Sequence, residues 1–130
     1  MSPTKETARQ ILVTAGSVTV EAELNPSATA QAVWETLPIT GQVNTWGDEV
    51  YFYVSLKMPE ENPQAVVEAG DFGYWPVGPA LCLFFGPTPA SRGNEIRPAS
   101  PVNIIGRVKG DARVLKGVAD GESIKLTRRE

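Results

Sequence analysis

The chain has 130 residues, of which 42% are hydrophobic and 21% charged, and its formal net charge is −3. This length suits a single folded domain, and the ordinary composition excludes a disordered or fibrous chain. The acidic balance argues against nucleic acid as a partner, because nucleic-acid binders carry a basic excess or a basic stripe. We interpret the one dense basic pair, Arg128-Arg129, as part of a solvated tail.

The counts of two residue types limit the catalytic mechanisms, metal sites and cross-links that this chain can have. Histidine is absent, and cysteine occurs once, as Cys82. The lack of histidine excludes Ser-His-Asp and Cys-His catalysis and the usual zinc ligand sets. A single cysteine excludes an intrachain disulfide. Residues 1–10 are too polar for a signal peptide, and no apolar run is long enough to cross a bilayer. We therefore expect a cytoplasmic protein without a metal, a cofactor or a membrane partner.

The N-terminal quarter predicts a leader and a hairpin. Residues 1–9 are expected to form a flexible leader, and residues 10–130 a single domain. A strand begins at residues 11–13, and Gly16 supplies a tight turn, because glycine tolerates positive φ. Residues 18–24 alternate apolar and polar side chains, which is typical of a half-buried strand.

One main helix is predicted, over residues 26–37. Asn25 and Ser27 are both candidate N-caps, and Pro26 suits the first helical position. Pro38 disfavours helical geometry at the preceding residue, so the helix should end there.

Residues 41–55 predict a central strand, because they are rich in β-branched and aromatic residues. A period of two divides this strand into an inward face with Val50, Phe52 and Val54 and an outward face with Glu49, Tyr51 and Tyr53.

The second half of the chain predicts short strands between glycine and proline turns. The expected strands lie within residues 70–76 after an initial turn, and at 80–85, 102–109 and 123–128. The run 80–85 is continuously apolar, which suits a strand buried on both faces. In the strand 102–109, alternation sets Val102, Ile104, Gly106 and Val108 against Asn103, Ile105 and Arg107. Residues 57–62 and 86–100 are expected to be loops, whereas 64–68 and 114–118 are short elements, either strands or helical turns.

Seven or eight short strands with one helix predict a mainly β fold, either a sandwich or a closed barrel. Residues 18–37, VTVEAELNPSATAQAVWETL, are similar to the opening of cyclophilins. WGDEVYF (46–52), GDFGYWP (70–76), FFGPTPAS (84–91) and PVNIIGRV (101–108) resemble the small cyclophilin-like domain family of bacteria and archaea. The resemblance runs from residue 11 onward. It implies a closed eight-stranded β-barrel capped by helices, in a family without an assigned biochemical role.

The resemblance does not extend to the residues of prolyl isomerases. Cyclophilins carry a Phe-His-Arg string on a central strand and a Gln-Gly-Gly-Asp string after it, and neither occurs here. The corresponding residues 45–50 include an acid and no arginine. That arginine hydrogen-bonds the substrate while the prolyl amide twists against a barrier of ~18–20 kcal/mol. An ionised carboxylate cannot donate such a bond, so we expect no standard isomerase activity.

Three groups of residues are candidate sites. The first is the outward face Glu49, Tyr51 and Tyr53, and the second is the aromatic set Trp46, Tyr74 and Trp75. The third is the long loop 86–100, where Arg97 either supplies the missing donor or pairs with Glu95 or Asp71. For all three, the alternative is that these side chains only pack the fold or face solvent. Asp48, Glu49 and Asp71 are a further carboxylate set, but their spacing matches no known metal loop. Cys82 is expected to be a buried, inert thiol.

The leading functional hypothesis is a binding module rather than an enzyme. Its ligand would be a short peptide or a small molecule held on the aromatic outer face near Trp46, Tyr51 and Tyr74. One alternative is a weak or divergent peptidyl-prolyl isomerase that uses Arg97 or Arg92. The other is a subunit of a homo-oligomer, or a partner-binding element, with exposed aromatics at the interface.

Overall fold

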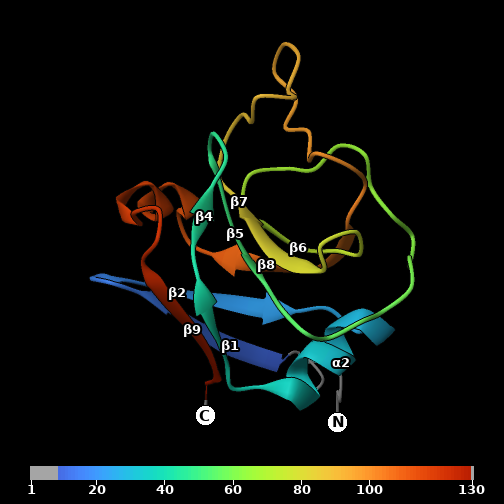
Figure 1. The fold of residues 1–130 in the computed structure, drawn as a ribbon, viewed down its shortest axis with the longest axis vertical. Helices are drawn as coiled ribbons and strands as arrows, with labels where there is room; N and C mark the ends of the chain where they lie inside the picture. The colour runs from blue at the N-terminus through green and yellow to red at the C-terminus, as the bar shows by residue number, and fades with distance from the viewer. Residues whose placement is uncertain (1–8, 130) are drawn as a thin grey trace, which may run out of the picture.

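The structure is a computed structural model that describes residues 9–129, and it consists mainly of β-strands (Figure 1). In chain order the elements are β1 (Arg9–Ala15), β2 (Val18–Leu24), α2 (Ala28–Thr36), β3 (Ile39–Gln42), β4 (Asn44–Thr45), β5 (Glu49–Tyr53), β6 (Asp71–Trp75), β7 (Ala80–Phe84), β8 (Asn103–Lys109), the 3₁₀-helix η1 (Ala112–Gly117) and β9 (Ser123–Arg128). Residues 1–8 of the expected leader lie outside the described residues, and Arg9 begins β1.

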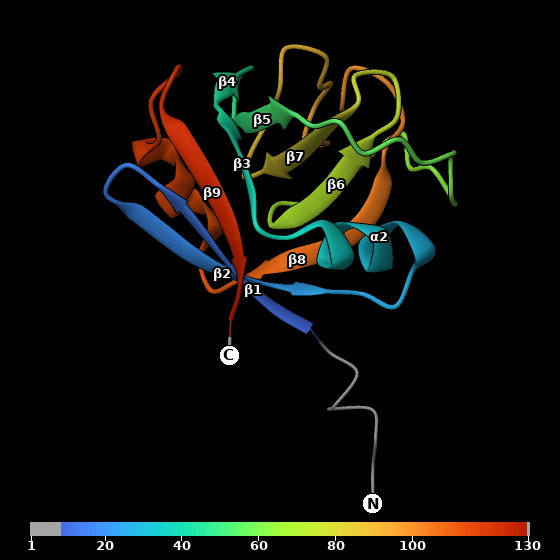
Figure 2. The same cartoon turned by 60° about the horizontal axis from the view of Figure 1, so that its bottom comes forward.

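The strands form one antiparallel sheet in the order β3-β9-β1-β2-β8-β6-β7-β5-β4. The two edge strands, β3 and β4, are separated in the chain by Val43 alone. Residues 39–45 therefore pair first with β9 and then with β5, which brings the two edges of the sheet together into a nearly closed barrel (Figure 2). The predicted barrel is confirmed. The hydrogen bonding divides it into nine strands rather than eight, because residues 39–45 form two short strands.

The principal core fills the barrel. Val50 and Phe52 of β5 are fully buried in it, and the partly buried Val54 packs against it, as the alternation of the central strand predicts.

The two helices lie at opposite ends of the barrel (Figure 2). One end is next to η1, whose Gly117 lies against Val18 at the start of β2, and the other is covered by α2, which follows the end of β2.

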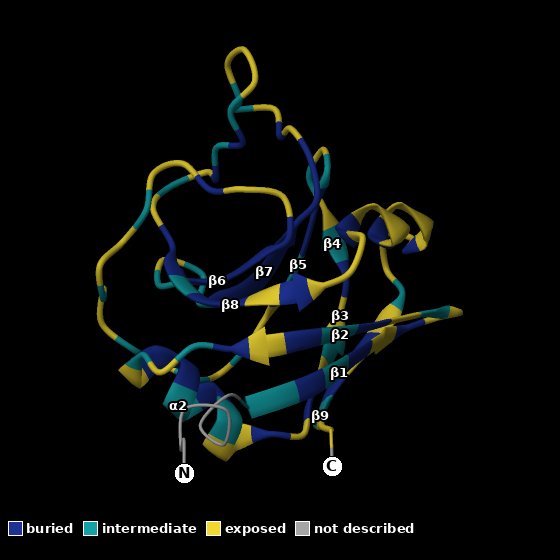
Figure 3. Ribbon diagram, turned by 180° about the vertical axis from the view of Figure 1, so that it is seen from behind, coloured by how far each residue is buried: buried dark blue, intermediate teal, exposed yellow. Residues whose placement is uncertain are grey.

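A second, smaller apolar cluster lies on the outer side of β6 and β7, and its buried members are Val67, Cys82, Phe84, Ile96 and Val102. All of β7 is buried, because Leu81 and Leu83 belong to the principal core while Cys82 and Phe84 belong to the second cluster. Figure 3 shows β7 dark blue along its length and β6 dark blue over most of its length. This confirms that residues 80–84 are covered on both faces, and Val67, Ile96 and Val102 supply the outer cover from the segments before β6 and after β7.

The helix is shorter than predicted. Ser27 is the N-cap, and its side chain accepts from the backbone N–H of Ala30. Asn25 instead accepts from the backbone N–H of Ser27. The C-cap Leu37 is extended, with ψ 145°, as a residue before proline prefers. Among residues 9–129, no helix is long and apolar enough to cross a membrane.

The alternation predicted along residues 102–109 is wrong, because β8 contains a bulge. The pairing with β6 leaves Ile105 as an extra residue between Ile104 and Gly106. Ile105 is fully buried in the principal core, whereas Ile104 packs on the second cluster. The backbone and side-chain amides of Asn25 donate to the carbonyls of Ile105 and Ile104, each at 2.8 Å, so a distant segment stabilises the bulge.

The basic pair at the C-terminal end is part of the fold rather than a free tail. Arg128 ends β9, and its guanidinium lies 4.5 Å from the centre of the Trp34 ring. Arg129 forms an ion pair with Glu21 at 2.9 Å.

Candidate functional site

A cavity of about 220 Å³ opens on the outer face of β5, beside the end of the long loop. Its lining comes from the turn before β5, from β5, β6 and β7, and from the chain that leads into β8. The lining residues are Trp46, Glu49, Tyr51, Trp75, Cys82, Pro98, Ala99 and Val102. Two candidate groups that lie far apart in the sequence, the outward face of β5 and the aromatic set, therefore meet at one place.

A tight turn positions two of the lining residues, Trp46 and Glu49. The backbone N–H of Trp46 donates to the carbonyl of Glu49 at 3.0 Å, and Gly47 takes a φ of +61° that other residues rarely adopt. Asp48 fixes this turn to the chain after β7, because its N–H donates to Pro87 and its carbonyl accepts from Phe85, both at 2.9 Å. The turn is thus held from both sides, which orients the cavity wall.

Among the described residues that line the cavity, Glu49 is the only acid, and it is 5% exposed. Burial raises its pKa to about 7, and contact with the Cys82 thiol opposes this shift. Burial also raises the pKa of Cys82, and the nearby Glu49 adds to that shift, so the thiol stays protonated. None of the lining residues within 9–129 is basic. Near neutral pH the Glu49 carboxyl therefore exists in both its neutral and its ionised form.

The aromatic walls meet at steep angles. Tyr51 and Trp75 have ring centres 6.4 Å apart and planes at 80°, and Tyr51 meets Tyr53 at 5.7 Å and 85°. The indole N–H of Trp75 donates to the hydroxyl of Ser100, which ties this ring to the end of the loop. Burial raises the pKa of Tyr51, so its phenol remains a hydrogen-bond donor. Tyr51 and Trp75 together form a rigid corner.

Three predicted site residues do not line the cavity. Tyr53 is on the same face of β5 but is 55% exposed. Tyr74 lies in the principal core rather than on the outer face, and its hydroxyl donates to Leu56 and accepts from Met58. Alternation along β6 places Trp75 outward and so turns its neighbour inward. Arg97 pairs with Glu95 in its own loop, at 2.7 Å, and is not among the lining residues.

Sequence reasoning missed the other half of the lining: Cys82, Pro98, Ala99 and Val102. Cys82 lies directly opposite Tyr51 in the pairing of β5 with β7. The continuous apolar run of β7 signals that its outer face is covered, but not by what. The long loop was a candidate site, yet the cavity uses only its last residues.

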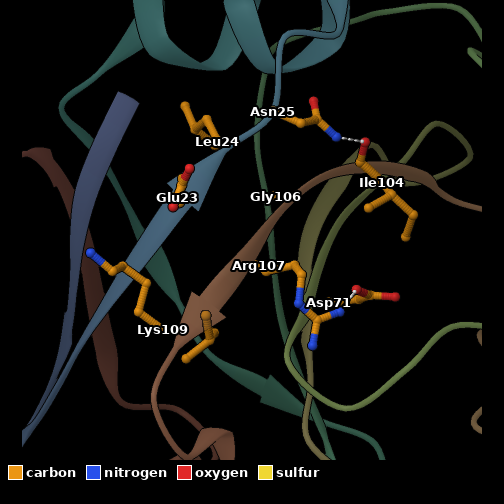
Figure 4. A pocket seen from close by; sticks show the side chains of 9 residues that line it. Glu23, Leu24, Asn25, Asp71, Ile104, Gly106, Arg107 and Lys109 are labelled. Atoms are coloured by element: carbon orange, nitrogen blue, oxygen red, sulfur yellow. Dashed lines mark hydrogen bonds and ion pairs between the residues drawn. The ribbon is translucent and has the colours of Figure 1, made fainter. Parts of the chain in front are cut away.

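A larger, more open depression of about 510 Å³ lies where β2 and β8 meet (Figure 4). Its charged groups are Glu23, Asp71, Arg107 and Lys109. The Arg107 guanidinium is bound to Asp71 at 2.7 Å, and Lys109 lies 4.0 Å from Glu21. Because both cations of this depression already have partners within the chain, the smaller aromatic cavity is the better candidate site.

The carboxylate set considered from the sequence does not form. Asp71 lines the depression between β2 and β8, whereas Glu49 lines the aromatic cavity. Asp48 faces Lys116, at 4.0 Å. Within the described part of the chain, no three His, Cys, Asp or Glu side chains are grouped so as to hold a metal ion.

Comparisons with known proteins agree with this architecture. A family model described as Cyclophilin-like matches residues 9–127. The solution structure of a hypothetical protein from Archaeoglobus fulgidus is similar, with 43% sequence identity and a TM-score of 0.80, over 94% of this chain and 95% of that one. No curated protein matches the sequence. The similarity therefore covers the whole barrel and the loop that borders the cavity.

Proposed function

The chain belongs to the cyclophilin-like family, and on that basis we propose that it is a binding module whose ligand, a short peptide or a small molecule, enters the cavity beside Glu49. The observation that carries this proposal is the gathering of Trp46, Tyr51 and Trp75 around a single buried carboxyl. Aromatic rings offer a large contact area at low entropic cost, and a few polar groups among them fix a ligand's orientation.

The size of the cavity limits what it accepts. Sites that enclose a whole drug-sized ligand have volumes of about 300–1,000 Å³, and this cavity has about 220 Å³. It therefore suits one side chain of a peptide or the head group of a small molecule. The rest of the ligand would extend over the exposed surface near Tyr53 and Ala99.

The two alternatives have less support. A divergent isomerase needs a guanidinium directed at the substrate amide, but Arg97 is paired with Glu95, and neither Arg97 nor Arg92 is among the lining residues. A homo-oligomer needs a contiguous exposed apolar patch. In the part of the chain that the structure describes, the large exposed apolar residues lie on four separate segments: Tyr53, Val66, Val77 and Val114.

A fragment screen followed by NMR of the indole N–H signals tests the proposal. The chain has three tryptophans, and two of them line the cavity while Trp34 lies on α2. We expect ligands to shift the signals of Trp46 and Trp75 and to leave that of Trp34 in place, so the third tryptophan is an internal control. If no member of a screen that includes short proline peptides shifts either cavity indole, the proposal fails.

A prolyl-peptide isomerisation assay separates binding from catalysis. We expect no rate gain over the uncatalysed reaction, even at high protein concentration, because the cavity lining holds no basic donor. A rate gain that Arg97→Ala abolishes would instead establish the enzymatic alternative.

A further inference from the structure

We propose that the cavity binds an organic ammonium group, whose positive charge lies between the aromatic walls and the Glu49 carboxylate. This inference rests on the proposed function, because it names the ligand class for the same cavity. Three features support it: the arrangement of the rings, the unpaired acid and the contrast with another aromatic site in the same chain.

The rings form the kind of enclosure that attracts a cation. Trp46, Tyr51 and Trp75 come from three different segments, and the last two stand at 80° to each other. The face of an aromatic ring carries a negative electrostatic potential. A cation within about 6 Å of the ring centre is therefore attracted to it, most strongly when the cation is shielded from water. Two ring walls at a right angle can contact the same ammonium group from two sides.

Glu49 supplies the opposite charge. It is 5% exposed, and within residues 9–129 it forms no ion pair, whereas Asp71 and Glu95 are each bound by an arginine. A buried carboxylate without a cation is costly, because burial removes its hydration. A ligand cation would supply the missing partner. An anionic ligand would be repelled, and a neutral one would leave the charge uncompensated.

Trp34 shows that a tryptophan ring of this chain is contacted by cations where arginines lie nearby. The Trp34 ring is contacted by Arg9 at 5.5 Å and by Arg128 at 4.5 Å. Among the described residues, no arginine or lysine takes such a place on Trp46, Tyr51 or Trp75. The cavity thus has the rings and the counter-charge for a cation that residues 9–129 do not provide.

Two probes of the same shape measure how much the positive charge of the ligand contributes to binding. Choline and its neutral carbon isostere 3,3-dimethyl-1-butanol differ by one positive charge, and both have a head that suits a small cavity. Titrations followed by the indole signals of Trp46 and Trp75 at about pH 8 should show choline binding at least ~10-fold more tightly. Butylammonium and Nα-acetyl-lysine amide then distinguish a free amine from a lysine side chain of a peptide, and binding of either supports the ammonium assignment.

The affinity for the cation should depend on pH. A bound cation favours the ionised carboxylate, and burial raises the Glu49 pKa of the free protein to about 7. Protons therefore compete with the ligand below that pH, and the choline affinity should fall by up to about 30-fold from about pH 8 to about pH 5.5. The affinity of the neutral isostere should not fall in this range, because its binding does not need the ionised carboxylate.

Two variants and one matched control assign the effect to the cavity. Glu49→Gln should remove both the preference for choline and its pH dependence, while the isostere still binds. Glu60→Gln is the matched control, since it removes an exposed acid that does not line the cavity, and it should preserve both properties. Trp46→Leu should reduce the preference without altering the pH dependence, because it removes a ring but no charge.

The outcomes separate this inference from the proposed function. Equal affinities for choline and its isostere would overturn the ammonium assignment and leave the binding module intact. If no ammonium probe shifts the indole signal of Trp46 or Trp75, the ammonium assignment is also overturned. The wider fragment screen would then decide the proposed function independently. A choline preference that survives in Glu49→Gln would show that the carboxylate is not the counter-charge.

Discussion

Glu49 and Tyr53 lie on the same face of β5, yet their exposed fractions are 5% and 55%. The difference comes from the cover on that face, because the last residues of the long loop border the cavity over Glu49 and leave Tyr53 in solvent. A carboxyl under such a cover loses hydration, which favours its neutral form. The same burial that forms a ligand cavity therefore lowers stability whenever Glu49 is ionised.

Glu49→Gln should stabilise the protein at alkaline pH. The ordinary pKa of this group is 4.5 and the folded value is about 7. Because the folded pKa is higher, the group's contribution is fully present below about pH 4.5 and is lost as the pH rises through 7. The shift corresponds to about 3 kcal/mol. In urea unfolding, the variant should exceed the parent by up to that amount at about pH 8 and match it near pH 4.

The exposed Glu60 provides a control for this experiment, since Glu60→Gln removes a negative charge without uncovering a buried site. Its pH profile should parallel that of the parent. If the parent and Glu49→Gln lose stability equally between about pH 5 and pH 8, the carboxyl is not the buried acid described here.

Among the elements, β8 determines how the barrel and the outer cluster fit together. Its bulge at Ile105 turns one side chain into the principal core while Ile104 faces the second cluster. Next to the bulge, Gly106 lies between β2 and β6, and an added Cβ there would be 2.3 Å from the carbonyl oxygen of Glu23. The close approach of β2 to β8 thus requires a residue without a side chain.

Gly106→Ala should lower the free energy of unfolding by about 3 kcal/mol, because the clash is with backbone and cannot be relieved by a side-chain rotation. Gly117→Ala is the matched control. Its added methyl group meets only a terminal methyl of Val18, at 3.2 Å, and its effect should stay within about 1 kcal/mol. Denaturant unfolding of both variants measures the difference, and equal effects would show that the strand contact is not tight.

At the scale of the whole molecule, the barrel depends on residues 39–45, which join its two edges. Val43 lies at the break between β3 and β4 and is 2% exposed. Its N–H donates to Glu122 at 2.8 Å, and its carbonyl accepts from Gly121 at 2.7 Å. Because β4 and β5 pair through only two residues each, this seam has fewer sheet hydrogen bonds than the hairpin of β1 and β2.

Val43→Ala should therefore weaken the seam more than the rest of the barrel. Removing two buried methyl groups costs about 2 kcal/mol. Hydrogen exchange should accelerate most at the Gly121 amide and less at the amides of β1 and β2, because local opening requires less free energy than global unfolding. Val114→Ala, at a residue that is 49% exposed, should leave both measurements near those of the parent. Uniform acceleration across the barrel would contradict a weak seam.

Local residue patterns were enough to predict the fold class and the two faces of the central strand. Alternation is a property of a single strand, so Val50 and Phe52 could be placed inward and Glu49 and Tyr51 outward without knowledge of any other strand. The continuous run of β7 likewise indicated cover on both sides. The motifs shared with cyclophilin-like domains supplied the barrel topology that alternation leaves open.

Which outward residues share a cavity depends instead on how the strands and the long loop pack together. The register that sets Cys82 opposite Tyr51, the direction in which Tyr74 points and the bulge at Ile105 all depend on strands far apart in the chain. The burial of Glu49 depends on a loop that returns over the sheet. Contacts of this kind arise from how separate segments pack, and no local pattern of residues encodes them.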